Sequence, residues 1–145
     1  MNESIRVLRT RAERRPLILV VDDEWAILKL LRQALPDYGI DLEIAPHWLS
    51  ALRKYEESQG QLEAALIDVQ MPVCDGPEVL GLQRSQNPKL KACFMTGFSK
   101  LHSKESLQRI SGWPVLEKPF VSLDFVALSL WRMIDEASSI EVSDA

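Results

Sequence analysis

Five short apolar runs alternate along the chain with segments whose apolar residues recur at helical spacing. The first run, Leu17–Val21, is continuous and is followed at once by acidic residues. A run of this length between polar or turn-forming residues is typical of a strand buried in a parallel sheet. The runs at 64–67, 90–95 and 115–116 repeat this pattern, whereas 40–45 alternates apolar with acidic residues and indicates a half-exposed edge strand.

The segments between these runs predict helices, because their apolar residues lie three and four positions apart. Pro36, Gly60, Pro88 and Gly112 mark where four of the helices end, and Ser122 is placed to cap the last one. The five expected helices cover about 24–35, 46–55, 77–87, 100–110 and 123–134.

Strand and helix therefore alternate five times, and right-handed crossovers then produce a parallel sheet with helices on both faces. A chain of 145 residues is expected to form one domain. We place that domain at 16–137, after a basic leader at 1–15 and before a frayed acidic tail at 138–145. The leader is either a solvated segment or a docking arm for an acidic partner or nucleic acid.

Charge and cysteine content narrow the class of protein. With 17 basic and 21 acidic side chains the net charge is −4, which disfavours a general nucleic-acid binder. The two cysteines, Cys74 and Cys93, lack the spacing of a zinc site and suit a reducing, cytoplasmic compartment. The opening residues hold no long apolar run, so neither a signal peptide nor a membrane span is expected.

Polar side chains follow the predicted strands at the points where each strand ends. Asp22 and Asp23 follow the first run, Asp68 the third, Thr96 the fourth and Lys118 the fifth. The carboxyl ends of parallel strands meet at one edge of a sheet, which is where open α/β sheets place ligands. Alone, Asp68 would more often cap a turn, but this grouping favours a functional site.

The grouping suggests metal-assisted phosphoryl chemistry. Three neighbouring carboxylates repel one another, and a hard cation such as Mg²⁺ (or Mn²⁺) relieves the repulsion. Asp23 and Asp68 are the natural ligands, with Asp22 acting directly or through water and a backbone carbonyl just after Asp68 as a further donor. Asp68 can attack phosphorus to form an aspartyl phosphate, while Lys118 neutralises the phosphoryl oxygens and Thr96 donates its hydroxyl hydrogen to one of them.

The sequence motifs at this edge resemble, in order and spacing, those of response-regulator receiver domains of two-component signalling, over about 17–135. The resemblance implies a flavodoxin-like, doubly wound five-stranded parallel sheet of order 2-1-3-4-5 with five helices, as in the chemotaxis-type single-domain regulators. The motifs are Leu-Val-Val-Asp22-Asp23-Glu, Ile-Asp68-Val-Gln-Met-Pro, Asp75-Gly76, Met-Thr96-Gly97 and Glu-Lys118-Pro119-Phe120.

The resemblance also implies a function. A histidine kinase or histidine phosphotransfer protein would donate a phosphoryl group to Asp68, with the Gln70 backbone carbonyl as a metal ligand and Thr96 and Lys118 contacting the group. The chain would then act on itself and would not be a turnover enzyme. Its fourth helix, fifth strand and fifth helix would form the face that contacts a downstream protein or a second copy of the chain.

Several points stay open at this level. The family often has an aromatic switch residue three positions before the lysine, where this chain has Val115, so only the Thr96 half of the switch is retained. Trp113 and Trp131 are either core residues or part of an exposed partner-binding surface. A phosphorelay intermediate, a constitutive binding module that is not phosphorylated and a true phosphohydrolase are the alternative functions.

Overall fold

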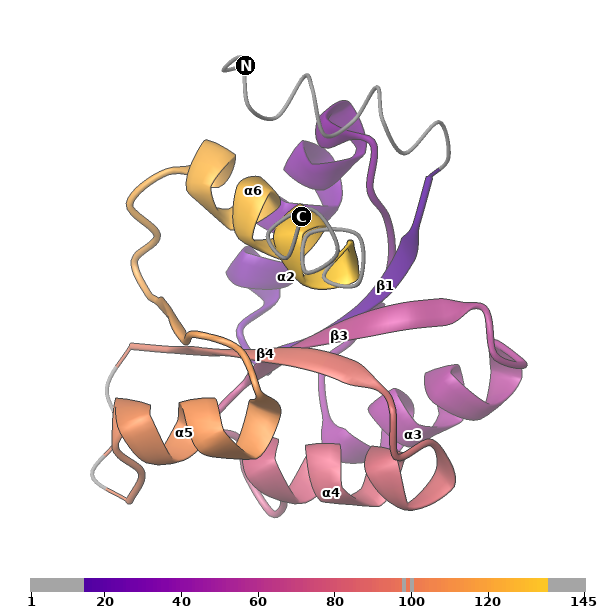
Figure 1. The fold of residues 1–145 in the computed structure, drawn as a ribbon, viewed down its shortest axis with the longest axis vertical. Coiled ribbons are helices and arrows are strands. Elements are labelled where there is room, and N and C mark those ends of the chain that lie inside the picture. The colour runs from indigo at the N-terminus through magenta and orange to yellow at the C-terminus, as the bar shows by residue number, and fades with distance from the viewer. Residues whose placement is uncertain (1–14, 98, 100, 136–145) are drawn as a thin grey trace, which may run out of the picture.

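A computed structural model describes residues 15–97, 99 and 101–135, and Figure 1 shows their arrangement. Nearly all of the basic leader and all of the acidic tail lie outside the described residues. None of the described helices is long and apolar enough to span a membrane. In chain order the elements are β1 (Leu17–Val21), α2 (Trp25–Ala34), the 3-10 helix η1 (Leu35–Tyr38), β2 (Asp41–Ala45), α3 (Trp48–Glu57), β3 (Leu62–Asp68), α4 (Gly76–Gln86), β4 (Lys91–Thr96), α5 (Lys104–Ser111), β5 (Leu116–Glu117) and α6 (Leu123–Ile134).

The strands form one parallel sheet in the order β2-β1-β3-β4-β5, which confirms the expected topology. β2 is an edge strand whose first four residues are only partly buried, as its alternating pattern predicted. β1, β3 and β4 are interior strands and are almost entirely buried. They are apolar on both faces because helices cover both sides of the sheet.

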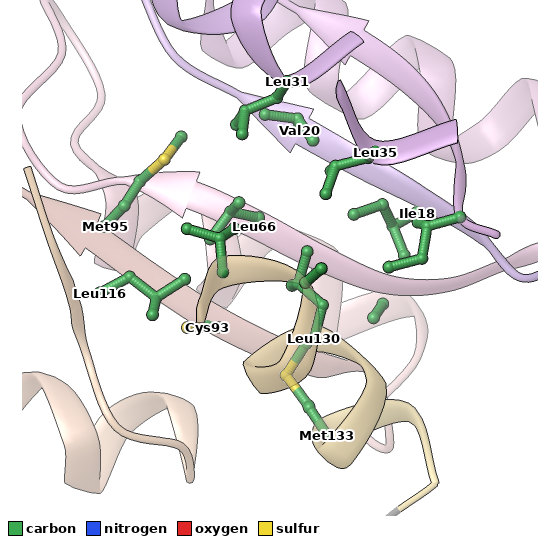
Figure 2. Packing of buried hydrophobic residues seen from close by; sticks show 14 of the residues in the cluster. Ile18, Val20, Leu31, Leu35, Leu66, Cys93, Met95, Leu116, Leu130 and Met133 are labelled. Carbon is green, nitrogen blue, oxygen red and sulfur yellow. The ribbon is translucent and has the colours of Figure 1, made fainter. Parts of the chain in front are cut away.

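Each face of the sheet carries its own hydrophobic core. α2 and α6 cover one face, and α3, α4 and α5 cover the other (Figure 1). Figure 2 shows the first core, in which Val20 and Leu66 of the sheet lie between Leu31 of α2 and Leu130 of α6. Successive strand residues point to opposite faces of the sheet. Leu19 and Val21 of β1 therefore belong to the second core.

The last helix is more deeply buried than its sequence pattern suggested. Trp131 has no exposed surface, and its indole Nε1 donates a hydrogen bond of 2.8 Å to the carbonyl of Tyr38 in η1. The expectation that Trp131 lies on an exposed partner-binding surface is therefore wrong. Trp113 is half-buried and packs against the same core as Trp131.

Two helices differ in detail from the prediction. α5 begins at Lys104, not near residue 100, because the Ser103 side chain accepts a hydrogen bond from the Ser106 backbone N–H and caps the helix there. In α2 the helical spacing of Ile27, Leu30 and Ala34 predicts an inward Leu30, but Leu30 is exposed and the fully buried residues are Leu28 and Leu31.

Candidate functional site

The five polar residues predicted at the sheet edge are brought together by the strand register. Val21 of β1 pairs with Ile67 of β3, so Asp22 and Asp68 follow at neighbouring positions. Thr96 ends β4, and Lys118 comes directly after β5. Carboxylate oxygens of Asp22, Asp23 and Asp68 all lie within 4.8 Å of one another.

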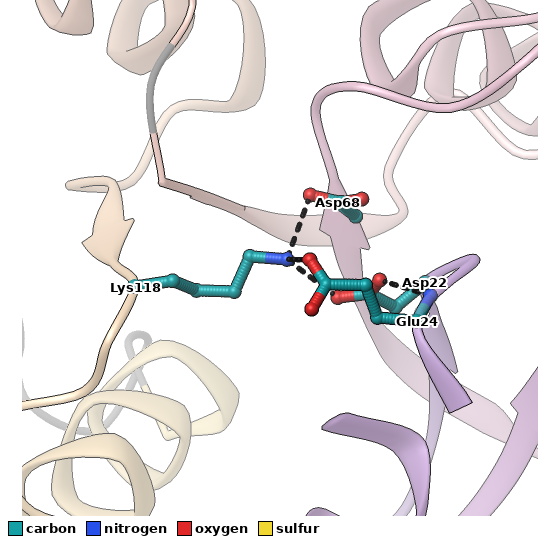
Figure 3. A network of polar contacts seen from close by, with 4 residues as sticks. All are labelled: Asp22, Glu24, Asp68 and Lys118. Atoms are coloured by element: carbon teal, nitrogen blue, oxygen red, sulfur yellow. Dashed lines mark hydrogen bonds and ion pairs between the residues drawn. The ribbon is translucent and has the colours of Figure 1, made fainter. Parts of the chain in front are cut away.

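Lys118 is held at the centre of this cluster, as Figure 3 shows. Its Nζ atom lies 2.9 Å from Asp22 Oδ2, 3.2 Å from Asp68 Oδ1 and 3.2 Å from Glu24 Oε1. The sequence pattern did not predict the contact of Glu24 with Lys118. The position of Glu24 directly after the acidic pair was the available signal.

Burial controls the charge state of the cluster. Desolvation, together with the negative charge of Asp22, raises the pKa of Asp68 to about 7. Desolvation also raises the pKa of Asp22. For Lys118 burial acts against the charged form, but the hydrogen bond to Asp22 and the nearby carboxylates outweigh it and raise the pKa of the ammonium group. Lys118 therefore stays charged and Asp68 is poised to gain a proton.

The donor set fits a hard divalent cation. The cluster offers only oxygen ligands, and its carboxylates carry more negative charge than one ammonium group can neutralise. Receiver domains bind Mg²⁺ in an acidic pocket of this kind. The residues present are thus suitable for holding such an ion.

An open hollow of about 470 Å³ lies over Asp68. Its lining includes Thr96, whose buried Oγ1 has no hydrogen-bond partner among the residues that the structure describes. A buried hydroxyl without a hydrogen-bond partner lowers the stability of the folded state. The Thr96 hydroxyl is therefore available to donate a hydrogen bond to a ligand. Gly97 leaves space beside it, since a Cβ atom there would meet its nearest neighbour only at 3.9 Å.

The loop between β3 and α4 is built closely around Asp68. A Cβ atom on Gly76 would lie 2.5 Å from the Asp68 carbonyl oxygen, so only glycine permits the start of α4 to pack there. The sequence had indicated Gly76 only as part of a turn. Val73 in the same loop has a φ of 71°, which is strained for a β-branched residue, and its side chain is exposed.

Two further residues predicted to take part in the site, Gln70 and Val115, and one histidine lie in the segments around this edge of the sheet. Gln70 is exposed and lines the hollow beside Asp68. Val115 is half-buried and lines a different groove, between α5 and α6. His102 lies in the loop before α5, with its Nε2 atom 3.2 Å from Asp75 Oδ2.

Comparisons with a family model and with known proteins place the chain in one family. The model of the "Response regulator receiver domain" matches residues 18–128. The chain is 30% identical to the sensor kinase CckA of Brucella abortus over 82% of its own length and 12% of CckA. It is also 30% identical to the transcriptional regulatory protein PrrA of Mycobacterium tuberculosis, over 77% of its own length and 47% of PrrA. The chain thus spans less than half the length of these relatives.

Solved structures show the same fold. A CheY-like receiver domain from Methanospirillum hungatei superposes with a TM-score of 0.75 at 27% identity, covering 86% of this chain and 98% of that one. The receiver domain of NtrX from Brucella abortus superposes with a TM-score of 0.73 at 28% identity, covering 81% and 98%.

Proposed function

Because the chain belongs to the response-regulator receiver family of two-component signalling, we propose that it accepts a phosphoryl group from a phosphohistidine donor on Asp68. The main support is the grouping, under one hollow, of a buried carboxylate, a partly buried lysine in contact with it and a threonine hydroxyl that is unpaired among the described residues. Acetyl phosphate with a divalent cation is expected to load the same residue, and intact mass detects the product.

The transfer is a displacement at phosphorus. A carboxylate oxygen of Asp68 forms the new O–P bond as the P–N bond of the phosphohistidine breaks and the imidazole leaves with the electron pair. Lys118, already 3.2 Å from Asp68 Oδ1, neutralises the phosphoryl oxygens. Thr96, whose hydroxyl is unpaired among the residues that the structure describes, donates its hydrogen to one of them. The chain acts on itself in this way and is not a turnover enzyme.

Mg²⁺ (or Mn²⁺), held by Asp22, Asp23, Asp68 and the Gln70 carbonyl, would supply positive charge that keeps Asp68 ionised and neutralises the transferred group. Saturating Mg²⁺ should therefore stabilise the folded chain, by about 1–3 kcal/mol at concentrations well above the dissociation constant. Thermal unfolding with and without Mg²⁺ measures this shift.

Asp23→Asn should weaken that stabilisation, because Asp23 is an exposed member of the cluster and is not the phosphoacceptor. Glu57→Gln is the matched control, since Glu57 ends α3 at the opposite end of the sheet. A wild-type chain whose unfolding temperature does not respond to Mg²⁺ would exclude the metal site.

Exposed apolar side chains in the segments that follow the carboxyl ends of the strands support a protein donor over a small phosphoester. Trp25 is 58% exposed, Val73 88%, Leu101 84% and Val121 91%, and each follows a different strand of the sheet. Apolar residues grouped around a polar site are typical of a docking surface. A phosphohydrolase acting on a small substrate would not need them.

Trp25→Ala should slow phosphoryl transfer by about tenfold when the donor is a histidine kinase that loads the wild-type chain. Loading by acetyl phosphate should stay unchanged, because the Trp25 side chain is largely exposed and does not line the hollow over Asp68. Ile110→Ala removes an exposed apolar side chain at the far end of α5 and serves as control. Equal slowing with both donors would show that Trp25 acts on the chemistry and not on docking.

Output is proposed to pass through a protein contact on the face formed by α5, β5 and α6. A groove of about 330 Å³ lies there and is lined by apolar side chains that include Val115, Phe120 and Phe125. Its occupant is a downstream protein or a second copy of the chain. Both cysteines are unpaired, in keeping with a proposed location in the cytoplasm.

A further inference from the structure

The helix α5 is attached to its neighbour α4 at both ends, and the two attachments differ in strength. The helices lie side by side on one face of the sheet (Figure 1). At the carboxyl end of α5, the Arg84 guanidinium donates hydrogen bonds to the carbonyls of Ile110 and Ser111, at 2.6 and 2.7 Å. It donates two more to Leu90, at 3.1 and 3.0 Å.

Arg84 is well suited to a permanent attachment. Burial lowers its pKa, but an arginine remains charged at any physiological pH. A positive charge at a helix carboxyl terminus is favourable, and its bonds to carbonyl oxygens are charge-assisted. Two of these bonds fix this end of α5 to α4, and the two to Leu90 hold Arg84 against the residue before β4.

The other end of α5 is joined to α4 by one side-chain contact among the described residues, and Lys104 at the start of α5 pairs separately with Glu117 of β5. His102 Nε2 lies 3.2 Å from Asp75 Oδ2, and both side chains are half-buried. The second oxygen of Asp75 accepts the Glu78 backbone N–H at 3.0 Å, and the Asp75 backbone N–H is bonded to the Glu78 carboxylate. Asp75 is therefore fixed at the start of α4, while His102 belongs to the loop that leads into α5.

This loop connects the site directly to α5. It begins after Thr96, whose hydroxyl has no partner within the described part of the chain, and ends at the Ser103 cap. A phosphoryl oxygen that draws Thr96 towards Asp68 would therefore be expected to pull on the described part of this loop that carries His102. Two charge-assisted hydrogen bonds from Arg84 hold the carboxyl end of α5 to α4, whereas the His102–Asp75 contact alone joins the described part of this loop to α4.

We propose that the His102–Asp75 contact is the releasable attachment that holds α5 in its unphosphorylated position and that it is lost when Asp68 carries a phosphoryl group. The inference rests on the proposed phosphoacceptor role of Asp68. Coupling of this kind is reciprocal, so whatever removes the contact also favours the phosphorylated arrangement. His102 and Asp75 are then positioning residues that act through the loop on Thr96.

The first test uses beryllofluoride with Mg²⁺ as a phosphoryl mimic and follows its binding by tryptophan fluorescence. His102→Ala and Asp75→Asn should each lower the apparent dissociation constant about three- to tenfold, the range of one partly buried hydrogen bond. Asparagine caps a helix about as well as aspartate, so Asp75→Asn removes the charge and keeps α4 intact. The double variant should bind no more tightly than either single variant, because both remove one contact.

His47→Asn is the matched control, since the other histidine caps α3 and accepts a hydrogen bond from the Ser50 backbone N–H at 3.1 Å. Its affinity for beryllofluoride should equal that of the wild type. Additive effects in the double variant, or affinities within about twofold of the wild type, would overturn the proposal. If the His102→Ala variant does not fold, Asp75→Asn alone decides between these outcomes.

A second test needs no phosphoryl group. Amide hydrogen exchange of residues 97–103 in the unmodified chain should be faster in both single variants and unchanged in His47→Asn. Unchanged exchange would show that the contact does not hold the loop, whether or not Asp68 is a phosphoacceptor. Faster exchange together with a wild-type chain that binds no beryllofluoride would support the attachment and count against the proposed function instead.

Discussion

The wild-type chain should gain one phosphoryl group, about 80 Da, on incubation with acetyl phosphate and Mg²⁺, and the Asp68→Asn variant should gain none. The amide of asparagine is not a nucleophile towards phosphorus, although it has nearly the shape of the carboxylate it replaces. The loss should therefore be complete, with the fold retained. Intact mass spectrometry at near-neutral pH measures the added mass, and samples prepared with and without Mg²⁺ are compared.

Asp41→Asn is the matched control for this experiment, because Asp41 lies on the edge strand β2 and pairs with Arg15 away from the site. It should accept the group as the wild type does. An adduct on the Asp68→Asn chain would place the phosphoacceptor elsewhere. A folded wild-type chain with no adduct would favour a constitutive binding module, and sustained release of phosphate from a small phosphoester would favour a phosphohydrolase.

Without divalent cations, the folded chain should lose stability as the pH rises from about 5 to about 7, by about 2 kcal/mol. Burial and the charge of Asp22 raise the pKa of Asp68 to about 7 in the folded chain, against 3.8 for an ordinary aspartate. Between these values the folded state binds more protons than the unfolded state. Raising the pH therefore favours the unfolded state, until Asp68 is ionised in both.

Urea unfolding at a series of pH values, with a chelator present, measures this dependence. Asp68→Asn should flatten the curve and should be more stable than the wild type at pH 7, since it removes a desolvated charge. Mg²⁺ should also reduce the loss, because its binding favours the ionised carboxylates. Stability that increases between pH 5 and 7 in the metal-free wild type would contradict the raised pKa of Asp68.

Much of the fold follows from local patterns in the sequence. Leu17–Val21 was predicted residue for residue because a short apolar run between polar residues has few alternatives to a buried strand. The alternation of apolar and acidic residues at 40–45 identified the edge strand, because such a pattern is typical of a half-exposed strand. The grouping of Asp22, Asp68, Thr96 and Lys118 was predicted by a rule of topology, since parallel strands present their carboxyl ends at one edge.

Helix boundaries and helix orientation were less well predicted. The spacing of apolar residues in α2 did not distinguish Leu28 from Leu30 as the inward residue, because neighbouring leucines offer two overlapping stripes. Trp131 is buried because η1 and the sheet enclose α6 from two sides. Its sequence neighbourhood fits an interface tryptophan equally well.

By itself the sequence determined the order of the strands and helices, the family motifs and the set of chemical groups at the sheet edge, because these depend on local periodicity and on the position of residues at strand ends. Only the tertiary structure decided which groups touch. Glu24 contacts Lys118 and His102 contacts Asp75 across long separations in the chain. Arg84 binds carbonyls of α5 in the same way. Such contacts depend on how helices pack against the sheet, and that packing is set by the volumes of both cores together, which no local pattern encodes.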